Sequence, residues 1–211
     1  MVTSKLNEAK EGTLFPVLES FYSLQGEGVN TGMAAFFIRL AGCNVHCPWC
    51  DTKESWNVKN AQLKDQQQLI EDAVLSGAPN VVITGGEPLL YPLDSLTKSL
   101  RSIGLKVWLE TSGSAPLSGT FDWICLSPKK IFPPADMDIY QKADELKVVI
   151  DSEKDFDWAQ ECKNKVGPKC ALVLQPQWNA DERIVSIIMD YIKENPSWRL
   201  SLQTHKYLNI R

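Results

Sequence analysis

The chain has 211 residues, of which 44% are hydrophobic and 23% are charged, and this size and composition are typical of one globular domain with a sizeable core. Its formal net charge of -4 argues against direct binding of nucleic acid, which needs a broad basic face. Residues 1–12 lack the apolar core of a secretory signal, and no apolar run reaches membrane-spanning length. We therefore expect a cytoplasmic protein that does not act at a membrane.

Short apolar segments with the length and composition of β-strands alternate with helix-like segments. We expect strands at residues 35–40, 80–84, 106–110, 123–126, 145–150, 171–175 and 199–203. We expect helices at residues 65–76, 93–103, 156–165 and 182–194, ending near Gly77, Gly104, Gly167 and Pro196. This alternation predicts a mainly parallel sheet, and the helices are too few for eight βα units. The predicted fold is α/β, a partial (β/α) barrel with a curved sheet; a plain doubly wound sheet is the alternative.

Three cysteines, Cys43, Cys47 and Cys50, have the spacing C-x3-C-x2-C. In a reducing compartment such a cluster indicates metal or redox chemistry, whereas Cys125, Cys162 and Cys170 are expected to be ordinary packed or partly exposed thiols. A structural zinc site with His46 as fourth ligand is one interpretation, although small zinc modules usually bring a second ligand pair from a distance. The other is a [4Fe-4S] cluster on three thiolates, which leaves one iron open to bind S-adenosylmethionine.

The cysteine motif is followed, after the next predicted strand, by the run Thr84-Gly85-Gly86-Glu87-Pro88, and the two together resemble the radical S-adenosylmethionine (SAM) superfamily. The segments SLQGEG, FIRLAGCN, WCDT, SPK, ELKVV and LQTHKYL narrow the resemblance to the 7-carboxy-7-deazaguanine synthase family, from about Glu19 to the C-terminus. The resemblance implies a carbon–nitrogen lyase of queuosine biosynthesis that converts 6-carboxy-5,6,7,8-tetrahydropterin to 7-carboxy-7-deazaguanine, with ring contraction and loss of ammonia.

The resemblance also implies cofactors and partners: a [4Fe-4S] cluster, S-adenosylmethionine, Mg²⁺, an electron donor such as flavodoxin or ferredoxin, and a second copy in a homodimer. Residues 1–211 would form a single radical SAM domain, in which residues 1–18 are an N-terminal extension and residues 199–211 complete the site. Two other functions share parts of the pattern. A glycyl-radical activase has the same cysteine spacing but acts on a protein, and a zinc-stabilised binding module is not an enzyme.

The resemblance assigns substrate contacts to Leu24, Gln25, Gly26, Glu27, Arg39, Thr84, His205 and Arg211. The side chains of Gln25 and Glu27 suit the amino-pyrimidinone edge of a pterin, although this stretch can also be read as a glycine-rich surface turn. Arg39 ends an apolar run and needs an anionic partner, which is either the carboxylate of the substrate or one within the protein. His205 has a structural role as its alternative.

Cofactor contacts are assigned to Trp49, Cys50, Asp51, Gly86, Glu110, Ser112, Ser127, Pro128, Lys129 and Gln175. Glycine at position 86 lets the backbone approach a ligand closely, but a tight turn without a ligand would have the same sequence. Lys129 alone would be read as a solvated surface lysine. Thr52 is the predicted Mg²⁺ ligand, with a turn-forming role as the alternative, and Asp51 is a second candidate for the metal.

Overall fold

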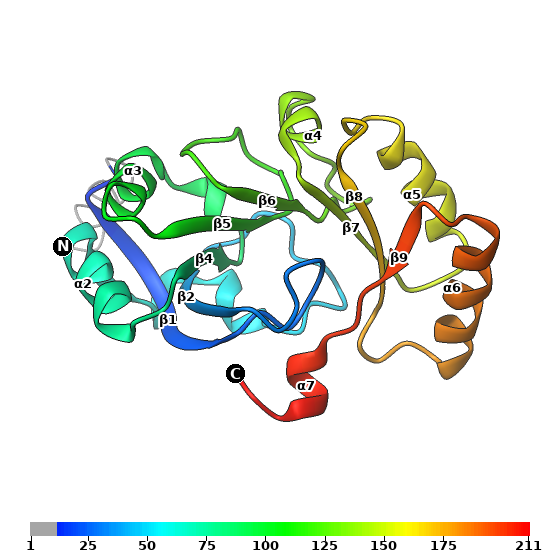
Figure 1. Ribbon diagram of the computed structural model, residues 1–211, viewed down its shortest axis with the longest axis horizontal. Helices are drawn as coiled ribbons and strands as arrows, with labels where there is room; N and C mark the ends of the chain where they lie inside the picture. The colour runs from blue at the N-terminus through cyan, green and yellow to red at the C-terminus, as the bar shows by residue number, and fades with distance from the viewer. Residues whose placement is uncertain (1–11) are drawn as a thin grey trace.

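The computed structural model describes residues 12–211, and this part of the chain forms one curved sheet of nine strands with helices along its outer side (Figure 1). The strands are β1 (Leu14–Leu24), β2 (Ala34–Leu40), β3 (Gln62–Asp65), β4 (Asn80–Gly85), β5 (Lys106–Thr111), β6 (Trp123–Leu126), β7 (Glu145–Ile150), β8 (Ala171–Pro176) and β9 (Trp198–Leu200). Their order is β3-β1-β2-β4-β5-β6-β7-β8-β9.

Neighbouring strands from β2 to β9 are parallel, whereas β1 is antiparallel to β2 and to β3. Within residues 12–211 the edge strands β3 and β9 do not pair, so the sheet stays open. The predicted partial barrel with a curved, mainly parallel sheet is therefore confirmed. Strands β1 and β3 were not among the predicted strands, because β1 mixes apolar residues with Glu19 and Ser20 and β3 is polar.

The helices are α2 (Gln66–Ser76), α3 (Asp94–Ser102), α4 (Asp138–Lys142), α5 (Asp155–Lys163), α6 (Glu182–Glu194) and α7 (Thr204–Leu208), with 3-10 turns η1 (Lys53–Trp56), η2 (Val58–Asn60) and η3 (Pro88–Leu90). The four predicted helices correspond to α2, α3, α5 and α6. Local signals fix their ends: the carboxylate of Asp65 accepts a hydrogen bond from the Gln68 N–H at the start of α2, and Gly77 ends α2 in a left-handed conformation.

Side chains alternate between the two faces of the sheet, as the two-residue period of a strand requires. On β2, Phe36, Ile38 and Leu40 belong to the main core, which the helices cover. Phe37 belongs instead to a second, smaller cluster with Val82 and Trp108 on the opposite face, which we call the inner face. Two residues further along each of these strands, apolar side chains give way to polar ones at the carboxyl end of the inner face: Arg39, Thr84 and Glu110.

The turn at residues 25–33, between β1 and β2, crosses the open side of the sheet. Its Gly26 carbonyl accepts a hydrogen bond from the Thr204 N–H at 2.8 Å, and its Gly28 N–H donates to Ser201 Oγ at 2.8 Å. The chain end returns to β1, where Ser23 Oγ donates to the Arg211 carbonyl at 2.6 Å; Figure 1 shows α7 and the C-terminus beneath the sheet. The turn at residues 25–33 and the C-terminal segment therefore cover part of the inner face.

The structure describes only part of the predicted N-terminal extension, residues 1–18. Residues 14–18 belong to β1, in which residues 14–17 pair with β3, while residues 1–11 lie outside the described part of the chain. No helix in residues 12–211 has the length and apolar character needed to cross a membrane.

Candidate active site

Two adjoining cavities of about 220 and 140 Å³ open on the inner face, at the carboxyl ends of the parallel strands. This is the edge at which β/α barrels build their sites. The wall between the cavities is formed by the residues that line both of them: Glu27, Arg39, Asp51, Thr52, Thr84 and Glu110. A ligand in one cavity would therefore be next to a ligand in the other.

The three cysteines of the C-x3-C-x2-C motif all line the larger cavity. Their loop is held by the glycine-rich run after β4: the Gly86 N–H donates to the Leu40 carbonyl at 3.0 Å, and the Glu87 N–H donates to the Gly42 carbonyl at 2.8 Å. A Cβ atom at Gly86 would lie 2.3 Å from the Gly42 carbonyl oxygen and 2.8 Å from Cys43 Cβ. Glycine is therefore needed at position 86 so that the two motifs can touch.

The donor set of this loop suits an iron–sulfur cluster better than a zinc ion. His46, the fourth ligand in the zinc interpretation, is exposed and packs against Trp56 with ring centres 4.9 Å apart. Among residues 12–211, no group of three or more His, Cys, Asp or Glu side chains is arranged to hold a single metal ion. Three thiols around one cavity, as at Cys43, Cys47 and Cys50, instead match the three-cysteine ligation of a cluster with one open iron.

Cys47 is buried, and its thiol is harder to ionise than an ordinary thiol. Burial raises the pKa of the Cys47 thiol; nearby Lys129 lowers it, and the thiols Cys50 and Cys43 raise it again, so that the net shift is upward. Because a metal centre binds thiolates and not thiols, the iron of a bound cluster would have to offset the cost of ionising Cys47.

Glu87 braces the glycine-rich run. Its side chain is fully buried, and it accepts hydrogen bonds from Leu89 N–H at 3.0 Å, Thr111 Oγ1 at 2.6 Å and Ser112 N–H at 2.9 Å. The Ser112 hydroxyl also donates to Glu87. These contacts tie the end of β4 to the end of β5, so that the larger cavity has a fixed floor.

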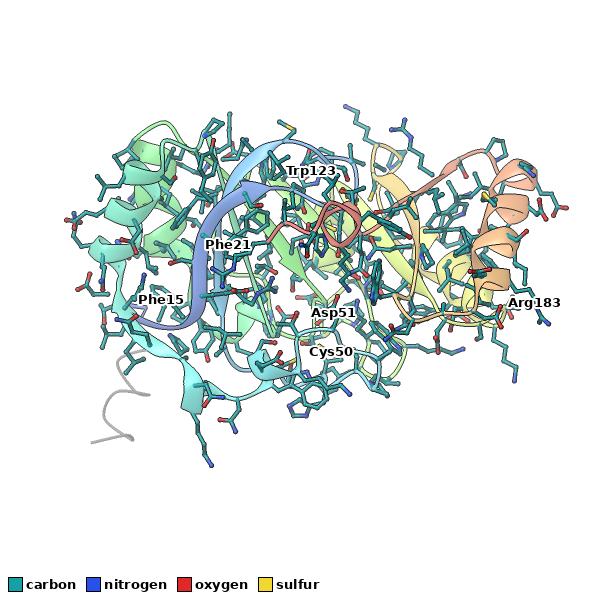
Figure 2. All side chains as sticks on the ribbon, turned by 90° about the horizontal axis from the view of Figure 1, so that it is seen from below. Phe15, Phe21, Cys50, Asp51, Trp123 and Arg183 are labelled. Atoms are coloured by element: carbon teal, nitrogen blue, oxygen red, sulfur yellow. The ribbon has the colours of Figure 1, made fainter. Side chains whose placement is uncertain are left out.

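Most of the predicted cofactor contacts lie together around the larger cavity: Trp49, Cys50, Asp51, Gly86, Glu110, Ser112, Ser127, Lys129 and Gln175. Figure 2 shows Cys50 and Asp51 next to each other on the loop that borders it. Lys129 is not a solvated surface lysine, since its ammonium donates to Ser127 Oγ at 2.5 Å and lies 5.4 Å from the centre of the Trp49 ring. Pro128 does not line the cavity; its carbonyl accepts a hydrogen bond from Trp158 Nε1 at 3.4 Å.

All the predicted substrate contacts line the smaller cavity: Leu24, Gln25, Gly26, Glu27, Arg39, Thr84, His205 and Arg211. Gln25 is only 7% exposed, so the stretch is not a plain surface turn. A Cβ atom at Gly26 would lie 2.2 Å from His205 Nδ1, which explains the glycine. Burial lowers the pKa of His205 below its ordinary value of 6.5, so that its imidazole is mainly neutral at pH 7.

Arg39 has the internal partner that one interpretation required. Its Nε donates to Glu19 at 2.8 Å, and Glu19 also lies 3.4 Å from a guanidinium nitrogen of Arg211. Arg39 nevertheless borders both cavities. The ion pair with Glu19 thus holds the guanidinium at the wall between them.

Asp51 and Thr52 follow the last cysteine and face the same wall. The Asp51 carboxylate accepts hydrogen bonds from Lys206 Nζ at 2.6 Å, Gln203 Nε2 at 2.9 Å and Thr52 Oγ1 at 3.3 Å. Burial raises the pKa of Asp51, but the contacts with Lys206 and Gln203 outweigh burial and lower it overall. Asp51 therefore fastens the C-terminal segment to the cysteine loop, and Thr52 borders both cavities.

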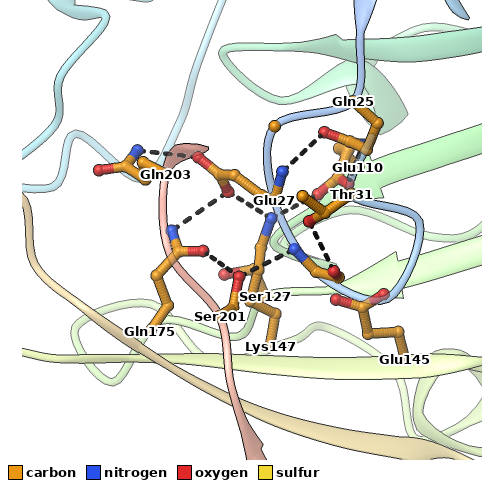
Figure 3. Close-up of polar contacts among 12 residues, drawn as sticks. Gln25, Glu27, Thr31, Glu110, Ser127, Glu145, Lys147, Gln175, Ser201 and Gln203 are labelled. Carbon is orange, nitrogen blue, oxygen red and sulfur yellow. Dashed lines mark hydrogen bonds and ion pairs between the residues drawn. The ribbon is translucent and has the colours of Figure 1, made fainter. Parts of the chain in front are cut away.

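Sequence reasoning missed two polar residues at the centre of the site, Lys147 and Gln203 (Figure 3). Lys147 Nζ lies 2.6 Å from Glu27 and 2.9 Å from Glu110. Gln203 donates from Nε2 to Glu27 at 2.8 Å as well as to Asp51. The signal for Lys147 was present, because it is a charged residue inside the otherwise apolar run of strand β7.

Comparisons with known proteins agree with this arrangement. Residues 37–147 match the model of the radical SAM superfamily. A 7-carboxy-7-deazaguanine synthase from Synechocystis sp. is 50% identical over 197 residues, which is 93% of this chain and 94% of that relative, and one from Flavobacterium psychrophilum is 46% identical over 211 residues, the full length of both.

The crystal structure of QueE from Escherichia coli superposes with a TM-score of 0.83 at 30% identity, covering 95% of this chain and 98% of that chain. These likenesses favour neither the glycyl-radical activase nor the zinc-binding module. The chain belongs to the 7-carboxy-7-deazaguanine synthase family of the radical SAM superfamily.

Proposed function

We propose that this protein converts 6-carboxy-5,6,7,8-tetrahydropterin to 7-carboxy-7-deazaguanine, with ring contraction and loss of ammonia, as a step toward queuosine. The observation that carries the proposal is the contiguity of the two cavities: the three cysteines line one, the predicted substrate contacts line the other, and six residues form the wall between them. Such a site can hold a reactive cofactor atom next to the substrate.

Cys43, Cys47 and Cys50 would hold the [4Fe-4S] cluster, which, with S-adenosylmethionine on its open iron, supplies one-electron radical chemistry. Gly86, Ser112, Ser127, Lys129 and Gln175 border the space beside the cysteines and would bind S-adenosylmethionine. Their hydroxyl, amide, ammonium and backbone groups suit its carboxylate, ribose and adenine parts. Pro128 would act through the conformation of its loop, since it does not line the cavity.

The smaller cavity would bind the pterin. Arg39 would contact the substrate carboxylate while Glu19 holds its Nε atom, and Gln25 and Glu27 would bind the pyrimidinone edge. His205, in its neutral form, can accept or donate a hydrogen bond at the far side of the cavity. Arg211 borders the same space from the chain end.

Thr52 would help to hold Mg²⁺, because its hydroxyl borders both cavities and oxygen atoms are the ligands that Mg²⁺ prefers.

As a radical SAM enzyme the protein needs a reductant, and a flavodoxin or ferredoxin would supply the electron. A homodimer is proposed from the resemblance alone. The cytoplasm is the proposed location, since the six cysteines, all free in the structure, fit a reducing compartment. One domain is proposed because the main core joins residues from Phe15 to Trp198.

The direct test is an anaerobic reaction of the reconstituted protein with 6-carboxy-5,6,7,8-tetrahydropterin, S-adenosylmethionine, a reductant and Mg²⁺, followed by the mass of the product. The Cys47→Ala variant should bind less iron and form no product. Cys170→Ala is the matched control, because Cys170 lies outside both cavities. Absence of 7-carboxy-7-deazaguanine from the reaction of a fully loaded wild-type protein would refute the proposal.

A further inference from the structure

Lys147 is a buried cation in a strand whose neighbours belong to the core. Its side chain is 6% exposed, while Leu146 and Val148 on either side are fully buried against the helices. A buried ammonium group costs several kcal/mol unless anions and hydrogen bonds compensate for the lost water. A lysine at an inward position of β7 therefore requires partners, and the structure supplies two carboxylates.

The two partners of Lys147 come from separate segments and lie in the wall shared by the cavities. Glu27, in the turn after β1, lies 2.6 Å from Nζ, and Glu110, at the end of β5, lies 2.9 Å from it (Figure 3). Lys147 itself lines only the larger cavity. One ammonium group thus joins two carboxylates that both cavities touch.

The amides around this trio are oriented by the two carboxylates. Gln25 Nε2 donates to Glu110 at 3.0 Å, and Gln25 Oε1 accepts from the Glu27 N–H at 3.2 Å. Gln175 and Gln203 donate to Glu27 at 3.1 and 2.8 Å. An ionised carboxylate can only accept, so its charge decides which end of each neighbouring amide faces it.

We propose that Lys147 is a positioning residue for the reaction: it holds Glu27 and Glu110 ionised and aligned in the wall between the cavities, so that Glu27 and Gln25 present a fixed pattern of acceptors and donors to the pterin. This inference rests on the proposed function. It assigns to Lys147 no contact with the reacting atoms.

The charges that face Lys147 explain why an uncharged residue would not replace it. Glu27, Glu110 and Glu145 approach from the β1–β2 turn, β5 and β7, and Lys129 is the other cation nearby. Cys125 approaches from β6, but burial raises the pKa of its thiol, so it carries no charge at neutral pH. Burial lowers the pKa of Lys147, but the groups around it outweigh burial and raise it well above its usual range. Without the ammonium, mutual repulsion would make one carboxylate take up a proton or turn away.

The test compares Lys147→Met, Lys147→Arg and the double variant E110Q/K147M with the wild type. The double variant has the same net charge in the trio as the wild type, because it loses one anion and one cation. Lys64→Met is the matched control: Lys64 is also shielded, with 14% side-chain exposure and a partner, Asp72, at 2.7 Å, but lies outside both cavities. Each protein is loaded with its cluster and its iron is measured.

Pterin binding is measured by calorimetry with S-adenosylmethionine but no reductant, and turnover is measured with reductant. We expect Lys147→Met to weaken pterin binding and raise its KM by about 100-fold, the range found when one partner of a buried charge pair is removed. Iron content should match the wild type, and 5′-deoxyadenosine should form in excess over product. Lys147→Arg should keep binding within about tenfold, and Lys64→Met should equal the wild type.

Pterin affinity of Lys147→Met within about threefold of the wild type would overturn the inference, as would an arginine variant as impaired as the methionine variant. If Lys147→Met does not fold, the double variant is compared with Glu110→Gln alone: equal pterin affinity in the two overturns the inference, and a further loss of about tenfold or more in the double variant with normal iron supports it. If neither folds, the role is structural and the inference is wrong. Failure of the wild type to bind or convert the pterin would instead count against the proposed function.

Discussion

Replacing Gly86 by alanine tests whether the glycine-rich run and the cysteine loop must touch for the cluster to be held. The added Cβ would lie 2.3 Å from the Gly42 carbonyl oxygen and 2.8 Å from Cys43 Cβ. One of these neighbours is backbone and cannot rotate away, so the cysteine loop has to move. Overpacking of this kind typically costs about 1–3 kcal/mol. In a domain of this size, each kcal/mol lowers the melting temperature by about 2–4 °C.

The assay has two parts: thermal unfolding of the metal-free protein, and iron and sulfide content after anaerobic reconstitution. Gly86→Ala should melt at a lower temperature and retain less iron per chain than the wild type, because Cys43 is displaced from its place beside the cavity. Gly167→Ala is the control, since its Cβ would be 3.7 Å from the nearest atom, an ordinary contact. Wild-type melting and full iron content in Gly86→Ala would refute the reasoning.

Three further predictions concern the wall between the cavities. Burial raises the pKa of Glu27, but Lys147 and the hydrogen bonds to Glu27 outweigh burial and lower the pKa from 4.5 to about 2. The ionised carboxylate therefore stabilises the folded protein fully above about pH 4.5, and this stabilisation is lost as the pH falls toward 2. Urea unfolding from about pH 6 to about pH 2 should show the stability difference between wild type and Glu27→Gln shrinking with acidification; a constant difference would contradict this. Arg39→Ala should weaken binding of the carboxylated pterin by about 30-fold or more and weaken binding of a decarboxylated analogue much less, because only the first ligand loses a contact with the guanidinium. Loss of the Glu19 ion pair affects both ligands equally and cancels in the comparison. Equal losses would argue against the carboxylate contact. Thr52→Ala should lose most of the rate increase given by Mg²⁺, whereas Thr52→Ser keeps the hydroxyl and should retain it; an unchanged response in the alanine variant would place the metal elsewhere.

The fold was largely predictable because its strands and helices carry strong local signals. Strands β6 and β7 and helix α6 have the predicted bounds, since each is a short apolar run or an amphipathic segment with clear ends. Strand β1 was missed because its pattern mixes polar and apolar residues. It pairs with β2 and β3 along its length, and such pairing cannot be read from a short stretch of sequence.

The candidate site divides in the same way. The cysteine spacing and the run at residues 84–88 were readable as motifs, and the structure places both beside the larger cavity. Lys147 and Gln203 lie within the segments ELKVV and LQTHKYL, but no site role was predicted for them, and Pro128, named through its motif, does not line the cavity. Motif reading finds residues that share a short stretch, whereas a charge that acts by holding distant carboxylates has no such neighbours in sequence.

The sequence by itself determined where most of the parallel strands lie, which cysteines can share a cluster, and, through the alternation along each strand, which side chains share a face. Only the tertiary structure decided how segments far apart in the sequence meet at the site. The contacts of Glu27 with Lys147 and Gln203 join residues 120 and 176 positions apart. The order and curvature of the sheet bring these segments together, because the β1–β2 turn must cross the open side to reach β7 and α7. Such long-range contacts depend on the packing of the whole sheet, which no local pattern specifies.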